Sequence, residues 1–175
     1  MRANRIGAVT LLACIVLATG GTADRPGALA ATAPGPQEVE VVAVVVDDRT
    51  HQPVVVLQGR RDKRHLSMAI GLAEATGIAV PLQGVTPPRP LTHDLFLTLF
   101  GRLNVTVKRV VITDLRDDIY YAVLHLTARG ESLALDARPS DAIALALRAK
   151  VPVLVEDRVF DKGGGTNTPA PRLRT

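Results

Sequence analysis

Residues 132–149 read SLALDARPSDAIALALRA, a strand-like start followed by a helix that begins at Pro139, the first-turn position that proline favours. Residues 65–79 read HLSMAIGLAEATGIA and repeat this order of strand and helix. Both helices carry an acid followed by alanine near their start, at Glu74 and at Asp141. The two stretches therefore predict one structural unit that occurs twice.

Further strands are expected before each unit. The β-branched runs that predict them are residues 39–46, 53–57, 105–112 and 120–127. Three strands followed by a helix thus occur twice, which indicates an internal duplication; chance similarity between two amphipathic helices is the alternative. With a last strand over residues 151–155, the pattern predicts an α+β fold with a mixed sheet and about three helices.

Two details of the helices can be predicted from single residues. Pro81 should end the first helix, because proline lacks the amide that an α-helix needs. A middle helix should begin at Thr92 and stop at Gly101. Its apolar side chains recur at helical spacing, so we expect Leu95 and Leu99 to be buried.

Composition narrows the class of protein. The chain has 175 residues, of which 47% are hydrophobic and 3% aromatic, with no Trp. Val, Ala and Leu must therefore build the core, and an extensive base-stacking platform is not expected. The net charge is +4, but residues 38–161 carry 15 basic and 16 acidic side chains, which argues against a large basic face. The single Cys excludes a disulfide framework and a Cys-based zinc site within the chain.

The two ends of the chain read differently from its middle. Residues 1–23 are typical of a signal peptide, with two Arg before a short apolar run and small residues after it. An uncleaved membrane anchor is the alternative. Residues 24–37 should form a flexible linker, residues 38–161 the domain and residues 162–175 a disordered tail. These features predict a protein that is secreted or in the cell envelope, without stable membrane association after signal cleavage.

Polar residues gather in two segments that run into helix starts. Residues 89–94 contain Arg89, His93 and Asp94, and residues 136–141 contain Asp136, Arg138, Ser140 and Asp141. An acid in the first turn of a helix is often structural, because it stabilises the positive end of the helix dipole. Arg, His and acid side chains at an anion-favouring helix start also suit phosphodiester hydrolysis.

Chemical roles follow from the residue types. The predicted catalytic residues are His93, Asp94, Asp136 and Asp141, with His93 as the acid or base. The predicted substrate-binding residues are Arg89, Arg138 and Ser140. Glu74 and Asp141 are candidate ligands for a divalent cation, Mg²⁺ or Mn²⁺, if the fold brings them together.

Residues 88–95 and 136–146 closely resemble the two signature segments of the bifunctional nuclease domain family, and Ile70-Gly71 with Glu74-Ala75 resembles a third. The resemblance covers about residues 39–161. It implies a compact α+β domain that acts on DNA and RNA and forms homo-oligomers. The chain departs from the family pattern at Gly77 and Pro81, which interrupt the first helix, and in its export signal.

Two functions are therefore expected. The first is an exported nuclease of broad specificity for which nucleic acid, DNA or RNA, is the substrate. The alternative is a non-catalytic oligomeric module of the cell envelope that binds an anionic ligand.

Overall fold

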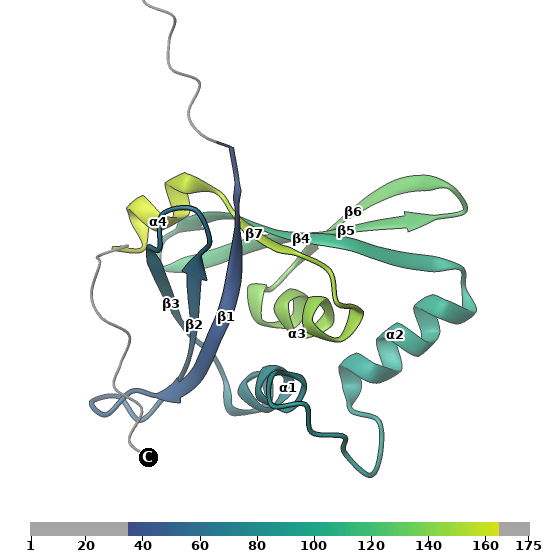
Figure 1. Cartoon of the computed structure of the whole chain (residues 1–175), viewed down its shortest axis with the longest axis horizontal. Coiled ribbons are helices and arrows are strands. Elements are labelled where there is room, and N and C mark those ends of the chain that lie inside the picture. The colour runs from purple at the N-terminus through teal and green to yellow at the C-terminus, as the bar shows by residue number, and fades with distance from the viewer. Residues whose placement is uncertain (1–34, 165–175) are drawn as a thin grey trace, which may run out of the picture. The chain divides into compact units, whose positions relative to one another are not determined.

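The computed structural model describes residues 35–164, which form a seven-stranded sheet and four helices (Figure 1). The strands are β1 (Gln37–Val46), β2 (Pro53–Gly59), β3 (His65–Ala69), β4 (Val105–Arg116), β5 (Ile119–Ala128), β6 (Glu131–Ala137) and β7 (Val153–Val155). The helices are α1 (Leu72–Leu82), α2 (Thr92–Arg102), α3 (Pro139–Ala149) and α4 (Asp157–Lys162). The predicted α+β class is confirmed, and the short α4 is one helix more than the three expected.

The sheet repeats one unit on either side of β7. Its strand order is β3-β2-β1-β7-β4-β5-β6. The strands β1 to β3 form an antiparallel meander that leads to α1, and β4 to β6 form another that leads to α3. Among the strands of residues 35–164, only β4 and β7 pair in parallel. The duplication indicated by the sequence is therefore present in the topology, with α2 as an added element between the halves.

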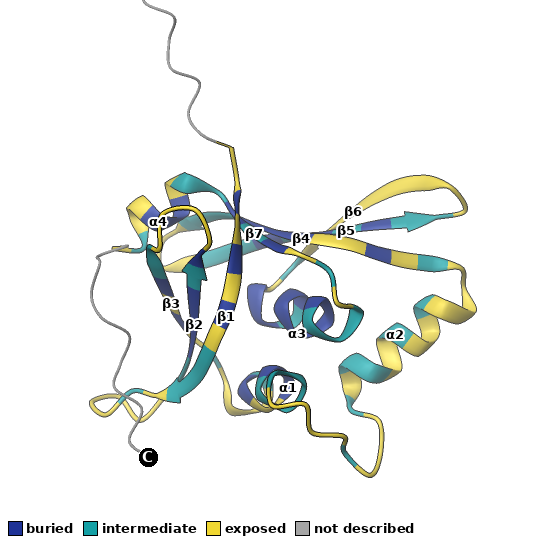
Figure 2. Ribbon diagram, in the orientation of Figure 1, coloured by how far each residue is buried: buried dark blue, intermediate teal, exposed yellow. Residues whose placement is uncertain are grey.

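The sheet curves around α3, which lies against its concave side with α1 beside it (Figure 1). Seven of the eleven residues of α3 are buried, and Ile143 is among those with no exposed surface. Most of the buried positions hold Ala, Ile or Leu, which are the residue types that protein interiors favour. Figure 2 shows this helix as the most deeply buried one. Irregular register in β1 and β4 adds to the curvature, since bulges increase local twist.

Helix α1 continues through its proline, so the prediction that Pro81 ends the helix is wrong. Pro81 has no N–H, and the carbonyl of Gly77 four residues earlier is thereby left without its helical donor. Arg148 Nη1, from α3, donates to that carbonyl at 2.6 Å. A guanidinium from a neighbouring helix thus replaces the missing amide, and α1 extends to Leu82.

Helix α2 presents a different face to the core from the one expected. Leu95 and Leu99 are 64% and 48% exposed, so the prediction that they are buried is wrong. Leu97 and Phe100 pack against the core instead. Together with His93 they stand at positions i, i+4 and i+7, which lie on one helix face. The face of α2 that packs against the core therefore begins with His93. Because histidine is polar, a search for apolar residues at helical spacing does not identify this face.

The predicted boundaries lie close to the ends of the described region. Gln37, placed in the linker by the sequence, begins β1 opposite Val155, and Lys162 ends α4 rather than beginning the tail. The predicted signal peptide, most of the linker and the tail beyond residue 164 lie outside the described residues. Within residues 35–164, no helix has the length and apolar character that crossing a bilayer requires.

The burial pattern predicts opposite results for two aliphatic positions. Ile143→Ala should lower the free energy of unfolding by about 2–5 kcal/mol, because it leaves a cavity where no solvent reaches. Leu99→Ala should change it by less than about 0.5 kcal/mol, since the side chain is half in water. Urea unfolding of both variants measures the difference, and equal losses would contradict the packing described for α2 and α3.

Candidate active site

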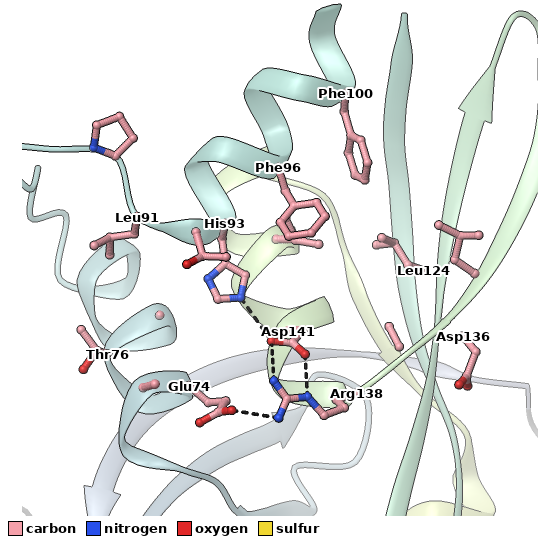
Figure 3. Close-up of a pocket in the computed structure, with 17 residues that line it drawn as sticks. Glu74, Thr76, Leu91, His93, Phe96, Phe100, Leu124, Asp136, Arg138 and Asp141 are labelled. Atoms are coloured by element: carbon pink, nitrogen blue, oxygen red, sulfur yellow. Dashed lines mark hydrogen bonds and ion pairs between the residues drawn. The ribbon is translucent and has the colours of Figure 1, made fainter. Parts of the chain in front are cut away.

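A cleft of about 1070 Å³ opens between α1, α2, α3 and the β5–β6 hairpin (Figure 3). One part of its lining is polar and contains Glu74, His93, Arg138 and Asp141. The other part is apolar and is formed by α2 and the two strands. Both halves of the duplicated fold contribute, since Glu74 belongs to the first and Asp141 to the second.

The polar side chains form one continuous chain of contacts (Figure 3). Glu74 Oε1 lies 2.9 Å from Arg138 Nη1. Arg138 donates to both oxygens of Asp141, from Nε at 2.7 Å and from Nη2 at 3.1 Å. His93 Nε2 lies 3.4 Å from Asp141 Oδ1. Four residues from three helical regions, far apart in sequence, therefore meet at one place.

The start of α3 explains why Arg138 and Asp141 pair. Arg138 is the N-cap residue and has extended backbone angles, and Pro139 then fixes the first helical turn. Asp141 follows three residues after Arg138, at the spacing that brings two side chains to the same face. The result is a bidentate ion pair, the strongest arrangement for arginine and a carboxylate.

His93 lies against Gly77 of α1. A Cβ atom at Gly77 would stand 2.8 Å from Cε1 of the imidazole, closer than real Cβ atoms approach, and 3.1 Å from Nδ1, which is tighter than most such contacts. Only glycine leaves room for the ring in this position. The residue that departs from the expected helix pattern is therefore the one that allows His93 to reach Asp141.

Asp94 points away from this chain of contacts, toward the body of α3. Its Oδ2 accepts the N–H of Leu91 at 2.8 Å, which fixes the start of α2. Its Oδ1 accepts a hydrogen bond from Nε–H of Arg148 at 2.7 Å, and the Arg148 side chain is 7% exposed. Asp94 does not line the cleft. Its position gives it a structural part, next in sequence to His93.

The pKa values of the two aspartates lie below their usual range. Burial acts to raise the pKa of Asp141, but hydrogen bonds and charge from Arg138, with a smaller part from His93, outweigh it. Burial likewise acts to raise the pKa of Asp94, and the Leu91 amide and Arg148 outweigh it there. Both carboxylates are therefore ionised at neutral pH and can serve as acceptors.

The other predicted site residues are not in contact with this group. Asp136 lines the cleft from β6, where Figure 3 shows its carboxylate apart from Asp141. Ser140 is buried and lines a second hollow, which shares Glu74 and Arg138 with the cleft. Arg89 is exposed in the loop before α2 and does not line the cleft. The roles of these three residues stay predictions.

The carboxylates do not assemble a metal site in this arrangement. Within residues 35–164, no three His, Cys, Asp or Glu side chains converge as ligands. Glu74 and Asp141, the candidate metal ligands, each accept hydrogen bonds from Arg138. The guanidinium occupies the place between them that a cation would need, so the donor set does not fit a divalent ion as it stands.

The comparison with known proteins agrees with the resemblance seen in the signature segments. The model of the family described as the bifunctional nuclease domain matches residues 55–167. The chain belongs to this family. The match includes every residue of the polar chain of contacts and both segments that supply it.

Relatives of this bifunctional nuclease domain occur in a bacterium and in plants. A Mycobacterium tuberculosis protein, named Uncharacterized protein Rv1829, is 42% identical over 127 residues, which cover 73% of this chain and 76% of the relative. Bifunctional nuclease 1 of Oryza sativa subsp. japonica is 32% identical over 123 residues, 67% of this chain and 37% of the relative. Bifunctional nuclease 1 of Arabidopsis thaliana is 26% identical, and the chain spans 40% of its length. The chain thus covers little more than a third of the plant relatives.

Two residues that organise the cleft of the bifunctional nuclease domain cannot be interpreted from the sequence: Arg148 is not among the predicted site residues, and Pro81 is expected to end its helix. Arg148 stands among aliphatic residues in a buried helix, which is an expensive position for a charge unless it is paired. Pro81 leaves a carbonyl without a donor inside another helix. The buried arginine donates to the carbonyl that the proline leaves unpaired. This contact cannot be inferred from the sequence, because nothing there shows that the two helices are neighbours.

Gly77→Ala tests the contact between α1 and His93. The variant should remain folded and differ in stability by less than about 1 kcal/mol, because the better helix propensity of alanine offsets the collision. The imidazole must move, so the NMR signals of the His93 ring should shift strongly. Gly101→Ala is the matched control, since nothing lies within 4 Å of a Cβ there. An unchanged His93 signal in Gly77→Ala would contradict the geometry.

Proposed function

We propose that the chain is a nuclease that hydrolyses phosphodiester bonds of DNA and RNA in this cleft. The observation that carries the proposal is the contact of His93 with Asp141, inside a cleft of a bifunctional nuclease domain. Relatives named bifunctional nucleases share the domain, at 32% identity for the rice protein. The site combines a group that can transfer protons with a carboxylate that orients it.

His93 acts as the acid and base in this proposal. In this proposal Nε2–H donates to Asp141, and Nδ1, which lies beside Gly77 of α1, is the nitrogen that can accept a proton. Nδ1 takes a proton from water, the water oxygen bonds to phosphorus, and the bond from phosphorus to the leaving oxygen breaks. The imidazolium then returns its proton to the leaving oxygen. Asp141 stabilises the positive charge that His93 carries between these steps.

Arg138 holds Asp141 in place and faces the substrate. Three of its five N–H groups point to Asp141 and Glu74, which leaves two for phosphate oxygens. The side chain is 66% exposed, so substrate can reach it. Glu74 fixes the guanidinium from the other side. In this arrangement Arg138 positions the catalytic carboxylate and stabilises the charge that develops on the phosphate.

The remaining predicted residues lie outside the chain of contacts from Glu74 to His93. Asp136 is the cleft carboxylate that does not contact Arg138, and it is proposed to hold a water on the β6 side. Arg89 is proposed to contact the nucleic-acid backbone outside the cleft. For Asp94 we propose the structural role that its contacts describe, and no step is assigned to Ser140 or to a metal ion.

Export and self-association complete the proposal. The predicted signal peptide over residues 1–23 would direct the protein to the cell envelope or the medium, where extracellular nucleic acid is the substrate. A homo-oligomer is proposed on the basis of the family resemblance. N-terminal sequencing of the mature protein and light scattering of the purified chain measure these two properties.

Replacement of His93 tests the proposed activity. Purified chain should cleave labelled single-stranded DNA and RNA, and His93→Gln should lower the rate by about 10²–10⁴-fold, the usual contribution of general acid–base catalysis. His125→Gln is the matched control, because His125 lies on β5 outside the cleft and should leave the rate unchanged. Parallel reactions with Mg²⁺, Mn²⁺ or a chelator measure any dependence on a cation.

Two results would contradict the proposal. Cleavage that persists in His93→Gln would come from a contaminant or from another site. A clean preparation without cleavage that still binds phosphate-containing ligands would favour the alternative, a non-catalytic module for an anionic ligand.

A further inference from the structure

The apolar part of the cleft contains an unusual share of the aromatic residues. The chain has three Phe, two Tyr and no Trp. Phe160 is fully buried in the core, whereas Phe96 and Phe100 line the cleft from α2. Phe96 is 47% exposed, although burial of a phenylalanine is strongly favourable. In a core built from Val, Ala and Leu, two of three Phe are thus placed at the cleft wall.

The two rings form one side of a slot. Their centroids lie 6.2 Å apart with the ring planes at 65°, and both project from α2 toward the β5–β6 hairpin (Figure 3). Leu124 of β5 and Leu135 of β6 line the facing side. These four side chains are uncharged, although Asp136 follows Leu135 on β6 and also lines the cleft. The slot between them therefore suits a flat, uncharged ring.

The slot is next to His93, which lies on the same helix as the two phenylalanines. Phe96 follows His93 by three residues, so the two side chains are neighbours on one face, about 5–6 Å apart at Cβ. That spacing is comparable with the separation of a base from its own phosphate. A base between Phe96 and Leu135 would place the adjoining phosphate near His93 and Arg138.

The charges also favour the base as the source of affinity. Glu74, Asp136 and Asp141 give the cleft three carboxylates, and its one arginine is already paired with two of them. Phosphate attraction alone is therefore weak here. Stacking of a base on an aromatic ring does not depend on the net charge of the site and tolerates any sequence.

We propose that the apolar part of the cleft binds one unstacked nucleobase, so that the substrate must be single-stranded or locally unpaired. The inference rests on the proposed nuclease function and assigns its substrate class. A base inside a duplex is stacked on both faces and must first be extruded, which costs free energy. The few aromatic residues make a slot for one base, not an extended platform.

A binding experiment tests the slot without reference to turnover. The probes are a labelled single-stranded DNA octamer, an octamer of the same length made only of abasic sites, and a DNA hairpin duplex. Anisotropy is measured with the His93→Gln chain, so that hydrolysis does not interfere. The octamer with bases should bind about tenfold or more tightly than either other probe.

Variants on the two faces of α2 locate the effect. Phe96→Ala with Phe100→Ala should remove most of the advantage of the octamer with bases. Leu95→Ala with Leu99→Ala should preserve it, because these leucines are exposed but do not line the cleft. Phe96→Leu with Phe100→Leu retains apolar bulk without flat rings, and it should bind like the alanine pair if stacking is the cause. Circular dichroism confirms that each variant is folded.

Each other outcome overturns the inference. Equal binding of the abasic octamer would show that bases do not enter the slot, and a tighter hairpin would show that unpaired bases are not required. If the phenylalanine pair instead changes the oligomeric state in light scattering and leaves binding unaltered, a second copy of the chain occupies the slot. Base-dependent binding without any cleavage in the active chain would reject the nuclease function and leave the base slot standing.

Discussion

The geometry of the cleft depends on one buried guanidinium. Arg148 of α3 donates to the carbonyl of Gly77 in α1, to Asp94 in α2 and to a carbonyl of its own helix. Helix α2 has no fully buried residue, so this ion pair is a principal tether of the helix that carries His93. The Arg148 side chain is 7% exposed and that of Asp94 is 34% exposed, so loss of Asp94 would leave a buried positive charge without its partner. Arg148 therefore positions the histidine without reaching the cleft.

The duplicated topology explains why the polar residues meet. Each half ends in a helix with an acid near its start, Glu74 in α1 and Asp141 in α3, and the two helices pack side by side under one curved sheet. Arg138 bridges the two acids. The inserted α2 then supplies His93 along with the phenylalanines. The repeat thus brings the starts of α1 and α3 together. The inserted α2 adds one wall of the cleft beside them.

Much of this arrangement follows from the sequence, and the exceptions have physical causes. Periodicity and turn residues predict the class, the repeat and the segments that hold His93, Arg138 and Asp141. They misjudge α2, because its inward face begins with a polar residue, and α1, because the donor that accommodates Pro81 comes from another helix. Contacts between helices determine which face of α2 is buried and whether α1 continues past Pro81. A local sequence pattern does not show such contacts. The contact of Asp94 with Arg148 is likewise formed between two helices, and the sequence around Asp94 does not show it.

The most direct test of the account is the protonation pattern of the His93 ring, measured by long-range proton–nitrogen NMR in the intact chain at a pH where the imidazole is neutral. We expect the tautomer with hydrogen on Nε2 in the unaltered chain, because Asp141 accepts that hydrogen. In Arg148→Gln we expect a mixture of tautomers, because α2 loses its ion pair with α3. Hydrogen on Nδ1 in the unaltered chain, or an identical pattern in Arg148→Gln, would contradict the proposed link from Arg148 through α2 to the cleft.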